Sequence, residues 1–104
     1  MKLWLDDERP MPEDFDLHVK TARGAIQVLE FSPYIDEVSL DHDLGDLDDC
    51  GDGYEVACWI EERAARGLLR QLKWSVHSAN PAGASKMRAA LESADRAWRH
   101  GRQS

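Results

Sequence analysis

The chain has 104 residues, of which 42% are hydrophobic and 32% charged, a composition that suits one folded domain over residues 1–104 and excludes long disorder and coiled-coil arrays. No apolar run approaches the roughly 18 residues that span a bilayer, and the N-terminus becomes charged too early for a signal peptide, so we expect a cytoplasmic protein without a membrane partner. The net charge is −7: residues 1–62 contain 18 acidic residues and 4 Lys or Arg, whereas residues 63–104 contain 2 acidic residues and 9 Lys or Arg. So acidic a chain is disfavoured as a binder of extended duplex nucleic acid.

The first third of the chain is predicted to form a strand, a loop, a second strand and a helix. An apolar run over 2–5 ends abruptly in acid, as a buried strand does at the edge of a sheet. Pro10 and Pro12 hold the next stretch in a loop, and 17–20 can form a strand. Thr21 offers an N-cap to a helix whose apolar residues recur at the i, i+3, i+4, i+7 spacing.

The same alternation continues to the end of the chain. Residues 37–40 form a third predicted strand, 54–65 a second helix closed by Gly67, 72–76 a fourth strand, and Pro81 opens a last helix. Strands that alternate with helices pair in parallel through right-handed crossovers. We therefore expect an α/β fold, a three-layer sandwich with a shortened four-stranded parallel sheet of order 2-1-3-4 and helices on both faces.

Several residues that could bind a metal or react are assigned no functional role. Cys50 and Cys58 have no CxxC spacing, which argues against a disulfide framework and a zinc site in a cytosolic chain. The acidic loop over 45–53 lacks the ligand pattern of an EF-hand, so we expect a solvated turn there. His18 and His100 lie away from the polar clusters.

Polar side chains follow three of the predicted strands, at the point where each strand ends. In an open parallel sheet, ligands bind beyond the carboxyl ends of the strands, so these side chains should converge on one edge. The candidates are Asp6, Asp7 and Arg9 after the first strand, Asp41, His42 and Asp43 after the third, and His77, Ser78 and Asn80 after the fourth.

The four carboxylates suggest a metal site, formed by Asp6, Asp7, Asp41 and Asp43. Like charges a few ångströms apart in a partly dry cleft repel strongly, and a divalent cation would relieve this. Oxygen ligands favour Mg²⁺ or Mn²⁺, and an imidazole ligand would tilt the choice towards Mn²⁺ or a later metal. Each acid taken alone could instead cap a turn.

Two histidines suggest acid–base chemistry at the same edge. One imidazole of the pair His42 and His77 could take a proton from an attacking hydroxyl while the other gives one to the leaving oxygen. Cleavage of a phosphodiester or opening of a cyclic phosphate requires such a pair near neutral pH. Ser78 and Asn80 could hold phosphate oxygens, with Arg9 as a planar clamp on the anion. His77 could also be a half-buried histidine with no catalytic part.

Four short motifs follow one another along the chain: LDDERP at 5–10, SLDHDLG at 39–45, DGYE at 52–55 and HSANPAG at 77–83. In this order they resemble the cyclic-phosphate-processing receiver-like family, which is related to the receiver domains of two-component signalling. The resemblance covers nearly the whole chain. It implies a receiver-like (flavodoxin-like) fold.

Receiver domains imply a role for each strand end. Their paired acids after the first strand hold Mg²⁺, the acid that ends the third strand accepts phosphate, and a Ser or Thr ends the fourth, positions that are filled here by Asp6 and Asp7, by Asp41 and by Ser78. The chain departs from receivers in lacking a fifth strand with its Lys and in adding histidines at the strand ends. The resemblance therefore implies a receiver scaffold refitted for hydrolysis of a cyclic phosphate.

The leading hypothesis is a metal-dependent phosphoesterase that acts on a 2′,3′-cyclic RNA end or on a small cyclic nucleotide or sugar phosphate. In this hypothesis Asp41, His42 and His77 are catalytic, and a water molecule activated by the metal attacks the phosphate. An alternative is a non-enzymatic receiver-like sensor or interaction module that binds a phosphorylated ligand or a protein partner. A third hypothesis is a small interaction protein whose acidic face mimics nucleic acid or docks on a basic partner. It fits less well because the acids gather at strand ends and not along an exposed helix face. The sequence identifies no protein partner.

Overall fold

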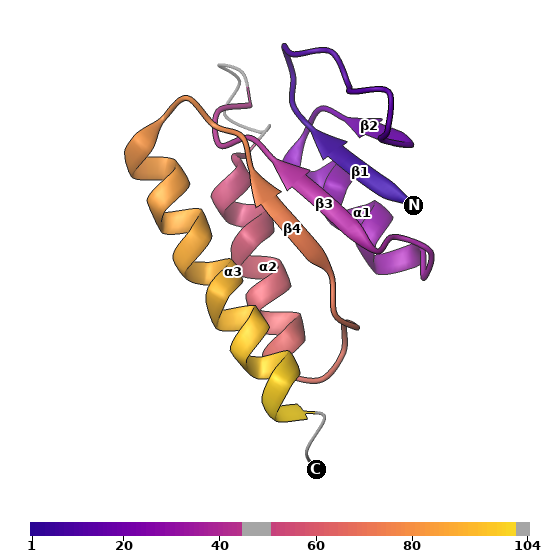
Figure 1. Ribbon diagram of the computed structural model, residues 1–104, viewed down its shortest axis with the longest axis vertical. Helices are drawn as coiled ribbons and strands as arrows, with labels where there is room; N and C mark the ends of the chain where they lie inside the picture. Colours follow the sequence, from indigo (N-terminus) through magenta and orange to yellow (C-terminus); the bar gives the residue numbers. More distant parts are fainter. Residues whose placement is uncertain (45–50, 102–104) are drawn as a thin grey trace.

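A four-stranded parallel sheet forms the centre of the computed structural model, which describes residues 1–44 and 51–101 (Figure 1). The predicted strands and helices are all present, with bounds that differ by one or two residues. In chain order they are β1 (Lys2–Leu5), β2 (Leu17–Val19), α1 (Ala22–Phe31), β3 (Glu37–Leu40), α2 (Gly53–Ala65), β4 (Lys73–Val76) and α3 (Pro81–Gly101). The predictions for 45–50, which include Cys50, lie outside the described residues.

Local signals for the helix ends act as expected. Thr21 caps α1, its hydroxyl accepting the N–H of Gly24 at 3.0 Å. After α2, Gly67 adopts a φ of 70°, a left-handed conformation that a glycine reaches without a steric penalty. Asp52, for which no capping role was predicted, caps α2 by accepting the N–H of Glu55 at 3.0 Å. The caps at Thr21 and Asp52 place the starts of α1 and α2 relative to the strand ends.

The sheet order is β2-β1-β3-β4, with every pair of neighbours parallel. Leu3 pairs with Val38, and Leu5 pairs with Leu40. The predicted order, parallel pairing and receiver-like α/β fold are therefore confirmed. No helix of the described ranges is both long enough and apolar enough to cross a membrane.

The layering differs from the expectation of helices on both faces. Leu3, Leu5, Val38 and Leu40 point to one face of the sheet, and all three helices bury their apolar residues against that face in one hydrophobic core. Figure 1 shows α1 and α2 behind the strands on this side. The helical core residues are Ala22, Ala25 and Leu29, then Val56, Ala57, Ile60 and Ala64, then Met87, Ala90, Leu91, Ala94 and Trp98.

Crossover handedness explains this arrangement. The connections from β2 to β3 and from β3 to β4 step across the sheet in the same direction, so right-handed crossovers place their helices on the same face. Only the connection from β1 to β2 steps the other way. It is a loop over 6–16 that carries Pro10 and Pro12, so no helix forms on the second face.

The loop over 6–16 packs on the second face at Trp4. Phe15 meets the Trp4 ring edge-on, with centroids 5.3 Å apart, and the indole N–H of Trp4 reaches the carbonyl oxygen of Arg9 at 3.4 Å. Further along this face, Lys73 and Ser75 of β4 are exposed. The second face is thus covered at β1 and open to solvent at β4.

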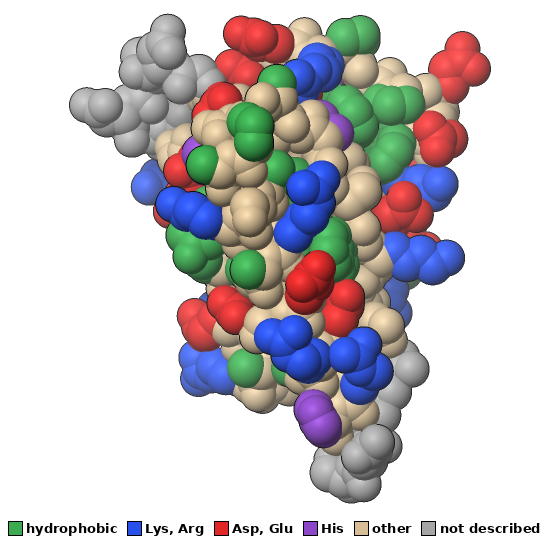
Figure 2. Space-filling model, turned by 60° about the vertical axis from the view of Figure 1, so that its left-hand side comes forward, with side chains coloured by type: hydrophobic (Ala, Val, Ile, Leu, Met, Phe, Trp, Pro, Cys, Tyr) green, Lys and Arg blue, Asp and Glu red, His purple; other side chains and the backbone are tan. Residues whose placement is uncertain are grey.

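Charge on the side that carries α3 is mixed in sign. Figure 2 shows Lys and Arg side chains interspersed with acidic ones over this side. Within α3, Lys86, Arg88 and Arg96 share the helix with Glu92 and Asp95. The excess of Lys and Arg in the second half of the sequence therefore does not gather into one basic patch there.

Candidate functional site

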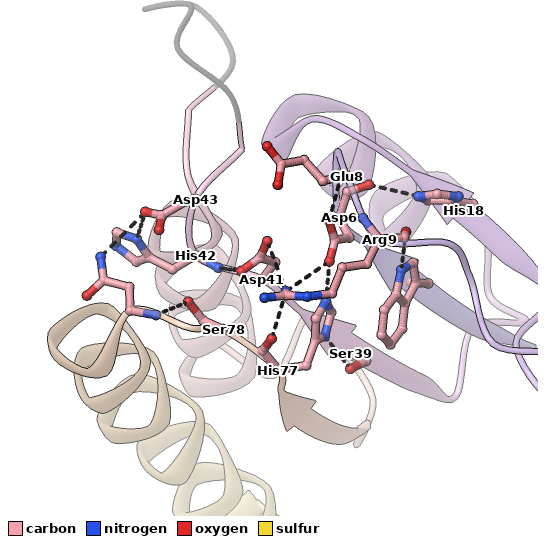
Figure 3. Close-up of polar contacts among 12 residues, drawn as sticks. Asp6, Glu8, Arg9, His18, Ser39, Asp41, His42, Asp43, His77 and Ser78 are labelled. Carbon is pink, nitrogen blue, oxygen red and sulfur yellow. Dashed lines mark hydrogen bonds and ion pairs between the residues drawn. The ribbon is translucent and has the colours of Figure 1, made fainter.

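Three strands end at one edge of the sheet, and each is followed there by a polar side chain (Figure 3). Asp6 follows β1, Asp41 follows β3 and His77 follows β4. One ligand atom from each of these residues lies within 4.8 Å of the other two. The parallel topology thus brings together residues up to 71 positions apart in the sequence.

The carboxyl group of Asp6 is fully buried and hydrogen-bonded at both oxygens. Oδ1 accepts the main-chain N–H groups of Glu8 at 2.8 Å and Arg9 at 2.9 Å. Oδ2 lies 3.2 Å from the Arg9 guanidinium and 3.0 Å from Nε2 of His77. Burial raises the pKa of Asp6, but these hydrogen bonds outweigh it and hold the pKa below its usual value. Asp6 is therefore an ionised carboxylate at neutral pH.

The imidazole of His77 is hydrogen-bonded at both nitrogens. Nδ1 lies 2.7 Å from Oγ of Ser39, and Nε2 faces Asp6. The ring stacks on the indole of Trp4 with centroids 3.8 Å apart. Burial lowers the pKa of His77, and the hydrogen bond and charge of Asp6 offset this only in part, so the pKa lies below its usual value. His77 is therefore neutral at pH 7.

Arg9 provides a cation between the two buried carboxylates. Its Nη1 nitrogen lies 3.2 Å from Oδ2 of Asp6, 3.6 Å from Oδ2 of Asp41 and 3.0 Å from the carbonyl oxygen of His77. The repulsion that led us to expect a metal ion is thus already reduced by a guanidinium. Asp41 itself is 7% exposed, and its Oδ1 accepts the N–H of His42 at 2.8 Å.

A second polar cluster surrounds His42, on the other side of Asp41 in Figure 3. Nδ1 of His42 lies 2.8 Å from Oδ1 of Asp43, which also accepts the side-chain amide of Asn80 at 3.4 Å. Nε2 of His42 lies 3.7 Å from a carboxylate oxygen of Asp52. The hydrogen bond from His42 lowers the pKa of Asp43 against the opposing effect of desolvation.

Two glycines let α2 and α3 approach the end of β3. The N–H of Gly53 donates to the carbonyl oxygen of His42 at 2.9 Å, and a Cβ at position 53 would overlap the carbonyl of Asp41. A Cβ at position 83 would overlap the His42 ring. A steric reason therefore explains the glycines in the motifs DGYE and HSANPAG: without a side chain, they let the starts of two helices lie against Asp41 and His42.

The remaining predicted site residues lie outside the group formed by Asp6, Asp41 and His77. Asp7 is partly exposed and Asp43 is exposed, and neither belongs to that group. Oγ of Ser78 accepts the N–H of Asn80 at 3.1 Å. Oδ1 of Asn80 accepts the N–H of Gly83 at 3.0 Å, so both side chains stabilise the first turn of α3.

Some strand residues contact the site although the sequence did not predict a role for them. Nε2 of His18 lies 2.7 Å from the carbonyl oxygen of Asp6, and Oγ of Ser75 donates to Oγ of Ser39 at 2.9 Å. A signal was available, because residues two apart in a strand share a face. By that rule Trp4, Ser39 and Ser75 precede Asp6, Asp41 and His77 on the second face of the sheet.

The donor set at this edge fits a divalent cation. Two buried carboxylates and one imidazole, from Asp6, Asp41 and His77, are a mixed oxygen and nitrogen set. Carboxylates suit Mg²⁺ and Mn²⁺, and an imidazole favours Mn²⁺ over Mg²⁺. An ion held there would have to replace the guanidinium of Arg9 between the carboxylates.

Comparison with known protein families gives a match over most of the chain. The family model for the cyclic-phosphate processing receiver domain matches residues 1–93, which span every strand and most of α3. No curated protein and no solved structure matches the chain with significance. Because the match runs through all three strand ends that form the site, the chain belongs to the family of cyclic-phosphate processing receiver domains.

Proposed function

We propose that this protein is a metal-dependent phosphoesterase that opens a cyclic phosphate. The observation that supports this most is the grouping of Asp6, Asp41 and His77, whose ligand atoms lie within 4.8 Å of one another beside an arginine. Membership of a family named for the processing of cyclic phosphates agrees with a phosphate ester as the substrate. Candidate substrates are a 2′,3′-cyclic RNA end and a small cyclic nucleotide or sugar phosphate.

Asp6, Asp41 and His77 would hold the ion, either Mg²⁺ or Mn²⁺. A divalent ion supplies a Lewis acid that makes water a better nucleophile at neutral pH and offsets charge on the phosphate. Asp7 is next to Asp6 and partly exposed, so it can reach the ion through water. Asp43 is exposed and already paired with His42, which favours a different role for it.

Arg9 would bind the phosphate once the ion occupies the space between the carboxylates. Its side chain is 45% exposed and comes from a loop, so the guanidinium can turn to face a substrate. A planar guanidinium matches two phosphate oxygens, which makes arginine a strong ligand for such anions. The hydroxyl of Ser78 and the start of α3 lie at the same edge and could contact a further phosphate oxygen.

His42 is the better of the two histidines for proton transfer. Asp43 hydrogen-bonds Nδ1 and can fix the ring with Nε2 as the reactive nitrogen, whereas both nitrogens of His77 contact buried groups. Attack of water on phosphorus forms one P–O bond and breaks one ester P–O bond. The proton lost by the water passes to Nε2 of His42, which returns it to the leaving oxygen.

The test is hydrolysis of a panel of 2′,3′- and 3′,5′-cyclic phosphates with Mg²⁺, Mn²⁺ or EDTA, with products identified by mass and by phosphorus NMR. We expect turnover that EDTA abolishes. His42→Ala should lower turnover by roughly 10²–10⁴ with metal affinity unchanged, because general acid–base help is of that size. His77→Ala should lower metal affinity and turnover together. Metal-independent turnover would contradict the proposal.

A non-enzymatic sensor is the second candidate. It is favoured by one observation: the guanidinium of Arg9 already bridges Asp6 and Asp41, so the repulsion between these carboxylates is reduced without an ion. If no member of the panel is hydrolysed but calorimetry detects binding of a cyclic phosphate, the sensor replaces the enzyme as the function.

A further inference from the structure

We propose that Ser39 and Ser75 form a hydroxyl pair that positions His77 and lets its ring exchange the hydrogen bond to Asp6 for a bond to a metal ion. This inference rests on the metal site of the proposed function. It assigns a role to two strand residues, here called the serine pair, that lie outside the cluster of acids and histidines at the sheet edge.

The serine pair links the buried site to solvent. Ser39 lies in β3 and is 3% exposed, and its Oγ is 2.7 Å from Nδ1 of His77. Ser75 lies in the neighbouring strand β4, directly opposite Ser39 in the register, and its Oγ donates to Oγ of Ser39 at 2.9 Å. Ser75 is exposed on the second face of the sheet, which none of the described helices covers.

Without a metal ion, the contacts determine which nitrogen of His77 carries the hydrogen. The carboxylate of Asp6 can only accept, so Nε2 of His77 donates to it across 3.0 Å. In a neutral ring Nδ1 is then an acceptor, and it takes the hydroxyl hydrogen of Ser39. The oxygen of Ser39 accepts in turn from Ser75.

With an ion on Nε2 of His77, the same groups must work in reverse. A ring nitrogen that binds a cation carries no hydrogen, so the hydrogen of the neutral ring moves to Nδ1 and the charge of the ring is unchanged. Ser39 now accepts from Nδ1 and turns its own hydrogen towards Ser75. Because Ser75 is exposed, it can donate to water, so the hydrogen bonds of His77, Ser39 and Ser75 all keep a partner.

Hydroxyl groups are suited to this reversal, because a serine can donate or accept by rotating one bond. Metal-bound histidines usually donate their second ring N–H to an oxygen acceptor, which orients the ring. Trp4 adds a second restraint, since its indole lies parallel to the ring at 5° and keeps the plane of His77 fixed while the hydrogen moves. Ser39 is thus a positioning residue that acts through His77.

The test compares Ser39→Ala, Ser39→Thr and Ser75→Ala with the wild type, and with Ser93→Ala on α3 as the matched control. Affinity for Mn²⁺ and Mg²⁺ is measured by calorimetry without substrate, and nitrogen NMR of the His77 ring reports which nitrogen carries the hydrogen, in EDTA and with Mg²⁺. We expect Ser39→Ala to weaken metal affinity about 10–100-fold, the size usual for loss of such a supporting partner. Ser39→Thr should restore most of this affinity, and Ser75→Ala should have a smaller effect.

In the wild type, the ring hydrogen should move from Nε2 to Nδ1 when Mg²⁺ is added. Metal binding by the wild type together with unchanged affinity in Ser39→Ala would overturn the role of the serine pair and leave the metal site intact. A hydrogen on Nδ1 in EDTA would also overturn it. Failure of the wild type to bind either ion would instead overturn the metal site, and with it the proposed enzyme. If Ser39→Ala does not fold, Ser39→Thr, Ser75→Ala and the wild-type spectra still decide the question.

Discussion

The imidazole of His77 lies flat on the indole of Trp4, with 3.8 Å between ring centroids and 5° between ring planes. The indole N–H of Trp4 also points to the carbonyl oxygen of Arg9 at 3.4 Å. One side chain of β1 therefore contacts both the ring that faces Asp6 and the loop that carries the guanidinium. The second face of the sheet, which carries Trp4, is part of the site because of this contact.

Trp4 should matter for stability as well as for the geometry of His77. Trp4→Ala removes a side chain that is 8% exposed, and we expect it to lower the free energy of unfolding by about 3–5 kcal/mol, as truncation of a buried aromatic does. Trp4→Phe should cost less, because a ring remains to stack on His77. Urea denaturation measures both, and Trp59→Ala, at a partly exposed position of α2, is the control. An equal loss at positions 4 and 59 would contradict the packing role.

Metal binding should raise stability through Asp41 and not through Asp43. An ion that binds only the folded state stabilises it by roughly 2.7 kcal/mol at a hundredfold excess over its dissociation constant. We expect thermal unfolding of the wild type to shift upwards in Mn²⁺ or Mg²⁺. Asp41→Asn should abolish the shift, while the exposed Asp43→Asn should keep it. A shift that survives in Asp41→Asn would place the ion elsewhere.

Substitution of Arg9 should change two affinities in opposite directions. Arg9→Gln removes the guanidinium between Asp6 and Asp41, so a divalent ion no longer competes with it for the carboxylates. We expect the affinity of the protein for the ion to rise up to about fivefold, which corresponds to the free energy of a partly exposed ion pair. Affinity for a cyclic phosphate should fall roughly 10–100-fold, as for loss of a hydrogen bond to a charged group. Calorimetry measures both, with Arg23→Gln on the exposed side of α1 as the control. A fall in both affinities would mean that Arg9 supports the site structurally.

Acid should destabilise the metal-free protein in two steps. The pKa values of His77 and Asp6 are both lower in the folded chain than in the unfolded chain. The unfolded chain therefore binds more protons on acidification, and the free energy of unfolding decreases as the pH decreases. The histidine step should begin below about pH 6.5 and the aspartate step below about pH 4, near the pKa values of the unfolded chain. Urea denaturation in EDTA across this range measures the effect. His77→Gln should remove the upper step, and stability that rises on acidification below pH 6.5 would refute the assignment.

Much of the fold follows from short-range patterns in the sequence. The apolar run that ends at Asp6, the N-cap at Thr21 and the glycine at position 67 are local signals, and they locate strands and helices to within one or two residues. The parallel order follows from the alternation of these elements and from crossover handedness. The approach of Asp6, Asp41 and His77 could be predicted for the same reason, since the carboxyl ends of neighbouring parallel strands meet at one edge.

The sequence alone therefore determined the elements, their order in the sheet and the edge where the acids and histidines gather. Only the tertiary structure decided that Arg9 lies between Asp6 and Asp41, and that Ser39 contacts His77 while His42 pairs with Asp43. The physical reason is that these contacts depend on the path of a proline-containing loop and on the directions of side chains from strands far apart in the sequence. Periodicity predicts the face on which a side chain lies, but it does not predict which neighbour that side chain meets.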